Sequence, residues 1–175
     1  MRQGQKTTTD VIRVNAPVDD PDVPVWTEVL HAARDPADPD QAVLVNVPFL
    51  VDGLNFGDLV RLGVEDDRGV RPILEVVMAS GCVHLLVAAG EDHVGELVAE
   101  LEELFPVHAL RIEGAHAELL SMSIHPDLDP DEVLEVVADF LESAEDFNPD
   151  LEEGPAIGPV CQSELGPLAW PIAGV

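Results

Sequence analysis

The chain has few aromatic residues and almost no lysine. Aromatic residues make up 4% of its 175 residues, tyrosine is absent and Lys6 is the single lysine, whereas hydrophobic residues of all kinds make up 46%. A buried core must therefore consist mostly of valine, leucine and alanine. No apolar run reaches the roughly 20 residues that a membrane-spanning helix needs, and residues 1–15 lack the apolar centre of a signal peptide. We therefore expect a cytoplasmic protein without a membrane partner.

Cysteine is also scarce, because Cys82 and Cys161 are the two in the chain and they form no CxxC pair. This spacing indicates neither a disulfide scaffold nor a zinc site built from thiolates. The six histidines form neither HxH nor HExxH. A cluster of His84, His108 and His116 across a predicted hairpin is an alternative that the spacing leaves open. We predict no metal site and no cofactor.

Basic residues are the third scarcity. The chain has 8 Lys and Arg against 35 Asp and Glu, a net charge of −27, and Arg111 is the single basic residue after Arg71. Such a field repels phosphate backbones and anionic lipids, which argues against direct binding to nucleic acid or to a membrane. Three explanations remain: solubility or salt adaptation, docking of a basic partner, and mimicry of a nucleic acid.

The first part of the chain reads as a leader followed by short strands. Residues 1–24 are rich in Pro, Asp and Thr and predict a flexible leader, in which residues 11–14 could form a short edge strand. Alternating and apolar runs then predict strands at 25–31, 42–47, 58–62 and 73–78. Short turns between them favour a small β-barrel or a curled antiparallel sheet over residues 25–80.

In the second part, residues 81–147, the spacing of apolar residues changes and predicts helices as well as strands. Its patterns predict a strand at 82–88, a helix at 92–105, strands at 107–112 and 118–124 around a turn at 113–116, and a helix that begins at Asp129-Pro130 and runs to residue 147. This order is typical of a ferredoxin-like half whose sixth strand comes from elsewhere in the chain. We expect one compact α+β domain over residues 25–153 and an extended C-terminal strap over residues 154–175.

Residues 47–60 contain the most patterned stretch, in which Gly53 and Gly57 allow a turn with positive φ between two predicted strands. Gly69 has the same role at a predicted hairpin tip, residues 65–69. The runs Asn46-Val47-Pro48-Phe49, Gly53 to Val60 and Glu75 to Gly81 resemble a bacterial family of domains of unknown function, number 4265. The resemblance covers residues 26–153. It implies a β-rich front half and a strand-helix-strand-strand-helix rear half, and no activity.

Three residues are weak candidates for catalysis. Asp58 follows Gly57 and could present a carboxylate as a base or ligand, or it could accept backbone N–H bonds that fix the turn. Cys82 and His84 stand two residues apart on a predicted strand, so both point to one face about 7 Å apart. They could be a thiol nucleophile with a nearby imidazole, or a buried cysteine beside a histidine.

The remaining candidates are polar groups or rings near the glycine turn. We predict that Asn55, Phe56, Asp58, Arg61 and Arg71 contribute to binding, although Arg61 could simply pair with Asp58 or Glu75. The favoured function is an acidic binding or accessory protein whose two helices attract a basic protein or peptide. The alternatives are a small hydrolase or transferase that uses Asp58 or Cys82 with a histidine, and a nucleic-acid mimic. The sequence leaves the oligomeric state open.

Overall fold

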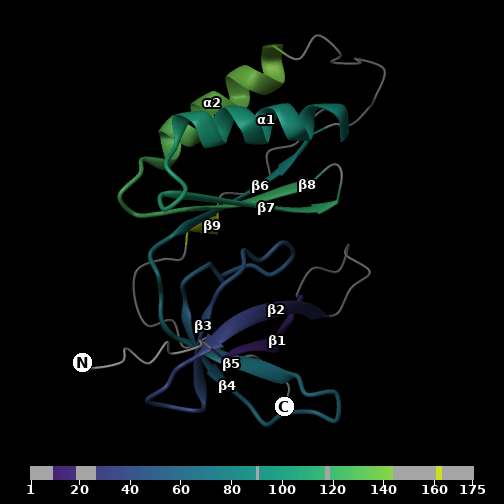
Figure 1. The fold of residues 1–175 in the computed structure, drawn as a ribbon, viewed down its shortest axis with the longest axis vertical. Coiled ribbons are helices and arrows are strands. Elements are labelled where there is room, and N and C mark those ends of the chain that lie inside the picture. Colours follow the sequence, from purple (N-terminus) through teal and green to yellow (C-terminus); the bar gives the residue numbers. More distant parts are fainter. Residues whose placement is uncertain (1–9, 19–26, 90, 117–118, 144–160, 163–175) are drawn as a thin grey trace, which may run out of the picture.

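The computed structural model describes residues 10–18, 27–89, 91–116, 119–143 and 161–162. It is a mixed α and β protein with a closed five-stranded barrel, a smaller sheet and two helices. Figure 1 shows these parts stacked, with the sheet between the barrel and the helices. No helix among the described residues is long and apolar enough to cross a membrane.

The barrel is formed by the first part of the chain. Its strands are β1 (Val11–Pro17), β2 (Thr27–Arg34), β3 (Gln41–Leu44), β4 (Leu59–Leu62) and β5 (Arg71–Met78). Consecutive strands pair antiparallel, and a short parallel pairing of β1 with β5, at Val14 and Arg71, closes the barrel. Inward side chains such as Leu30, Leu44 and Val60 are fully buried in its core.

The prediction of a flexible leader is wrong for residues 11–17, which form β1. The alternative of a strand at residues 11–14 is confirmed, although this strand lies within the closed barrel and not at an edge. Alternation explains this strand, because Val14 and Ala16 are buried whereas Val11 is half exposed. β2 and β5 pair with the two edges of this strand, and its apolar face, with Val14 and Ala16, is buried in the core of the barrel. Residues 1–9 and 19–26 of the predicted leader lie outside the described residues.

The second part forms the sheet and its helices. Its strands are β6 (Val83–Ala88), β7 (Leu110–His116), β8 (Leu119–Ile124) and β9 (Cys161–Gln162), and its helices are α1 (Glu91–Leu104) and α2 (Pro130–Ser143). The strand order is β7-β8-β6-β9, and each neighbouring pair is antiparallel. The predicted turn at 113–116 is wrong, because β7 continues through it. Most of the predicted strap lies outside the described residues, but residues 161–162 form β9.

The two faces of this sheet differ in chemistry. Leu85, Leu120 and Met122 are buried in one core with apolar residues of both helices. Residues that alternate with them point to the opposite face, where His84, Ser121 and Ser123 are buried. In Figure 1 the barrel lies on the side of the sheet opposite the helices. The sheet therefore meets the helices through an apolar face and the barrel through a polar one.

Local signals in the sequence explain the turns and the helix start. Gly53, Gly57 and Gly69 have φ values of 77°, 85° and 75°, as the sequence predicts for positions that disfavour a β-carbon. Asp129 caps α2, since its Oδ1 accepts the N–H of Asp131 at 3.0 Å. The predicted strand before Gly53 is wrong beyond Leu44, because residues 45–58 form an irregular loop.

Candidate functional site

The loop of residues 48–58, called the barrel loop below, runs from the barrel to the polar face of the sheet. Glu28 on β2 holds its beginning, because its two carboxylate oxygens accept the N–H groups of Phe49 and Leu50, each at 2.9 Å. Burial raises the pKa of Glu28, and the N–H groups of Leu50 and Phe49 oppose that rise. A carboxylate of the barrel wall therefore fixes the shape of the loop.

Asp58 holds the end of the barrel loop. Its Oδ2 accepts the N–H of Asn55 at 2.8 Å and its Oδ1 accepts the N–H of Ser80 at 2.7 Å. The side chain is fully buried, and burial raises the pKa of Asp58 against the effect of these N–H groups. Both oxygens therefore serve the backbone, which favours the turn-fixing interpretation over a base or ligand.

His84 and Ser121 connect the barrel loop to the sheet. The Nε2 of His84 lies 2.7 Å from the Oγ of Ser121, and this hydroxyl donates to the backbone oxygen of Pro48 at 2.5 Å. Burial lowers the pKa of His84, although the negative charge of Asp52 and the oxygen of Pro48 act to raise it. A neutral imidazole is therefore built into the junction between the two parts.

The direction of these bonds has a chemical consequence. A serine hydroxyl has one proton, and Ser121 gives it to a carbonyl oxygen that can only accept. The Nε2 of His84 must then act as the donor toward Ser121. A serine nucleophile needs the opposite, with the imidazole accepting the hydroxyl proton. This arrangement holds the loop and does not activate Ser121.

Cys82, the other candidate nucleophile, is buried immediately before β6 and is not part of that strand. Its backbone N–H donates to the Oγ of Ser80 at 3.2 Å, next to the anchor of Asp58. Burial in such a place keeps the thiol out of reach of a substrate. In the part of the chain that the structure describes, no group of three or more His, Cys, Asp or Glu side chains could hold a metal ion.

Asn55 and Phe56 belong to the barrel loop. The ring of Phe56 lies 4.6 Å from the guanidinium carbon of Arg111 on β7, a favourable cation–π contact. Asn55 is 1% exposed, and neither its Oδ1 nor its Nδ2 has a hydrogen-bond partner among the described residues. The same holds for the buried Oγ of Ser123, which is opposite Arg111 in the β7–β8 ladder.

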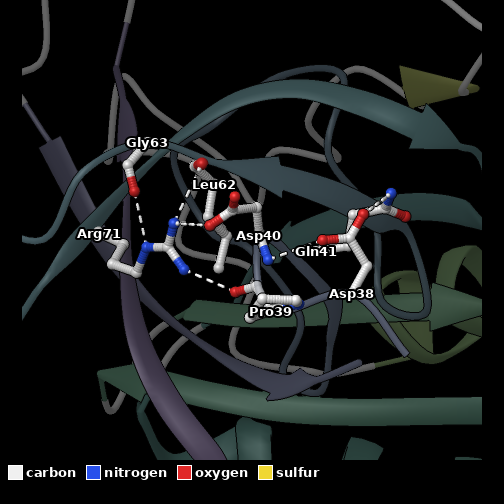
Figure 2. A network of polar contacts seen from close by, with 7 residues as sticks. All are labelled: Asp38, Pro39, Asp40, Gln41, Leu62, Gly63 and Arg71. Atoms are coloured by element: carbon white, nitrogen blue, oxygen red, sulfur yellow. Dashed lines mark hydrogen bonds and ion pairs between the residues drawn. The ribbon is translucent and has the colours of Figure 1, made fainter. Parts of the chain in front are cut away.

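The two arginines predicted to bind a ligand have structural contacts. Figure 2 shows the guanidinium of Arg71 donating to the backbone oxygens of Gly63 at 2.6 Å and Pro39 at 2.7 Å, and to the carboxylate of Asp40 at 2.7 Å. Its planar donor fork ties two loops of the barrel together. Arg61 pairs with Glu75 across β4 and β5. Neither arginine contacts the residues that hold Asp58.

The outer face of the helices carries the strongest charge. No Lys or Arg occurs in α1 or α2, and nine of their acidic residues are exposed: Glu96, Glu100, Glu102, Glu103, Asp131, Glu132, Glu135, Asp139 and Glu142. Neither helix has a basic residue in its last turn. We call these nine carboxylates the acidic helix face. Carboxylates near the C-terminus of a helix are repelled by the negative end of the helix dipole, so a bound cation would stabilise this face.

Sequence reasoning missed Glu28 and Ser121. One signal for Ser121 was present, because Leu119–Ile124 reads Leu-Leu-Ser-Met-Ser-Ile, with hydroxyls at alternate positions of an apolar strand. Such a pattern indicates that the second face of the strand meets polar groups. Glu28 had no comparable signal, since its partners lie 21 and 22 residues away in the sequence.

The pH dependence of stability should reveal the buried imidazole. The pKa of His84 in the folded chain lies below its ordinary value of 6.5, so the unfolded chain takes up a proton first as the pH falls. Its contribution to stability is therefore present above pH 6.5 and is lost on acidification. We expect His84→Gln to flatten the fall of urea midpoint between about pH 7 and pH 5. Equal slopes in both proteins would contradict this role.

Fold and site together define a two-part α+β protein in which a closed barrel and a helix-covered sheet are joined by a polar junction. The model of DUF4265, a domain of unknown function, matches residues 28–146, so the chain belongs to that family. The resemblance in the sequence is thereby confirmed. No curated protein matches the chain.

A solved structure supports the same architecture. The chain is similar to a hypothetical protein from Neisseria gonorrhoeae whose crystal structure is known, with a TM-score of 0.57 and 18% sequence identity. The match covers 77% of this chain and 87% of that one. At this identity the likeness concerns the fold alone.

Proposed function

We propose that this protein is a binding or accessory protein that engages a basic protein or peptide through the acidic helix face. One observation carries the proposal: the two helices expose nine carboxylates and contain no Lys or Arg. Complementary charge of this kind steers a cationic partner and sets its orientation. The contacts of Asp58 and Ser121 favour structural roles, so a hydrolase or transferase has less support.

Two further statements belong to this proposal. We infer a ferredoxin-like arrangement for the second part, supported by the order β7-β8-β6-β9, the antiparallel neighbours and the helices that follow β6 and β8. We also infer that binding takes place in the cytoplasm. The two cysteines without a pairing motif support a reducing compartment.

The test begins with capture of partners by the tagged full-length chain from a lysate of its own organism, with elution by salt. The decisive step uses the purified partner and two double variants that each remove two exposed charges. Glu100→Gln with Glu103→Gln alters the acidic helix face. Glu65→Gln with Asp67→Asn alters an exposed turn of the barrel.

We expect the helix variant to weaken binding about three- to tenfold at low salt, and the barrel variant to change it less than about twofold. Both variants change the net charge equally, but only the helix variant removes carboxylates that would contact the partner at short range. The measurement is the Kd at two salt concentrations. Equal weakening by both variants would mean that only the overall field matters and would overturn the proposed face.

A further inference from the structure

The outer edge of β7 is an unpaired strand edge. Among the described residues β7 pairs with β8 alone, while the barrel is closed by β1 and β5. The backbone oxygen of Ala109 accepts the N–H of His125 at 2.7 Å. This bond determines which backbone groups of the strand face β8. Residues 111 and 113 then also bond to β8, and the alternate residues 110, 112 and 114 direct their N–H and C=O groups outward.

Two of the outward residues have unused backbone groups. The N–H of Leu110 bonds to the oxygen of Pro106 at 3.1 Å, but Ile112 and Gly114 have no such partner among the described residues. Proteins usually protect such an edge with proline, lysine or a covering segment. β7 contains neither proline nor lysine, and its bulge begins only after Gly114.

The surroundings of this edge suit a cationic chain. The last two turns of α1 expose Glu100, Glu102 and Glu103 with no basic residue, and the chain passes from there through a short turn into β7. Two apolar side chains are exposed on the same path, Leu104 at 55% and Val107 at 85%. The segment that leads directly into β7 thus offers both negative charge and apolar contact.

We propose that an extended basic segment of the partner adds to the outer edge of β7 as an antiparallel or parallel strand. Ile112 and Gly114 would supply the backbone bonds, the end of α1 would receive Lys or Arg side chains, and Leu104 and Val107 would contact apolar ones. This is strand addition to an exposed sheet edge. This inference rests on the proposed function, which supplies the basic partner. A second copy of this chain fits less well, since it would bring two acidic α1 ends together.

A matched pair of variants isolates one backbone group. Gly114 is exposed, and an added β-carbon would meet nothing within 4 Å. Gly114→Pro removes the outward N–H, whereas Gly114→Ala retains it at the same place. Proline is tolerated on an edge strand where its nitrogen faces away from the ladder. Thermal unfolding of both variants shows whether each is folded.

The test titrates the full chain with an eight-residue peptide of alternating arginine and valine, and follows amide exchange by NMR. We expect slower exchange at Ile112 and Gly114 on binding, and a Kd that is roughly three- to tenfold weaker for Gly114→Pro than for Gly114→Ala, since one hydrogen bond is lost.

Other results overturn the inference in distinguishable ways. Salt-sensitive binding without protection of these amides would reject strand addition and leave the acidic helix face in place. If the peptide does not bind and the wild-type chain captures no basic partner, both proposals are rejected. Concentration-dependent protection without any peptide would identify a second copy as the occupant. If Gly114→Pro does not fold, amide protection in the wild type still decides.

Discussion

Replacing Asp58 with alanine is expected to lower the free energy of unfolding by about 2–4 kcal/mol. The variant leaves the buried N–H of Asn55 and the partly buried N–H of Ser80 without their acceptor. Each unpaired buried group costs about 1–3 kcal/mol. The expected total is less than the sum of the upper values because burial of the charged carboxylate is itself unfavourable, and the variant removes this cost. The same unfavourable burial raises the pKa of Asp58. Urea unfolding followed by circular dichroism measures the difference.

The matched control is Asp66→Ala in the hairpin tip. Asp66 has the same local role, since its Oδ1 accepts the N–H groups of Arg68 and Val70, each at 2.9 Å. The bond to Arg68 is exposed and the bond to Val70 is only partly buried, so water can replace much of the lost acceptor and the loss of stability should be smaller. If both variants lose the same stability, burial is not what makes Asp58 important.

Asp58→Asn refines the test. Its amide has the size of the carboxylate but offers one acceptor oxygen, so one backbone N–H would face an NH₂ group. We therefore expect Asp58→Asn to be destabilised as well, despite its similar shape. A stability equal to that of the wild type would show that the second bond contributes nothing.

The second large effect is expected at the junction between the two parts. Ser121→Ala removes the hydroxyl that bonds both to the oxygen of Pro48 and to the imidazole of His84. Both partners are buried, so the variant should lower the free energy of unfolding by about 2–3 kcal/mol. The urea midpoint at pH 7 measures this, where the imidazole is neutral.

Ser123→Ala is the control for Ser121→Ala because it makes the same chemical change two residues further along β8, on the same face. The Oγ of Ser123 is buried and has no hydrogen-bond partner in the part of the chain that the structure describes, so its removal should leave stability unchanged or slightly raised. A loss at position 123 as large as that at position 121 would mean that the junction depends on packing at this face and not on the Pro48–Ser121–His84 bonds.

The barrel loop is held by Glu28, Asp58 and Ser121, which belong to three different strands or strand ends. These anchors explain why the loop keeps one conformation although it has no regular secondary structure. A ligand-binding role for the loop gains no support from them, since each polar anchor is satisfied within the chain.

Local features of this protein could be predicted from the sequence alone. Both helices follow from apolar residues at helical spacing, and Asp129-Pro130 marks the start of α2. The positive φ values of Gly53, Gly57 and Gly69 follow from the preference of glycine for such angles. The pairing of Arg61 with Glu75, and the turn-fixing role of Asp58, were among the alternatives that the spacing offered.

Only the tertiary structure decided the contacts between distant segments. β1 became a barrel strand because β2 and β5 pair with its two edges and the barrel core buries its apolar face, although its own sequence is short and lies within a Pro- and Asp-rich region. Ser121 and Pro48 are 73 residues apart, and no local pattern determines which carbonyl a buried hydroxyl will meet. Periodicity and turn preferences act within a few residues, whereas strand pairing and buried polar bonds depend on how the whole chain packs.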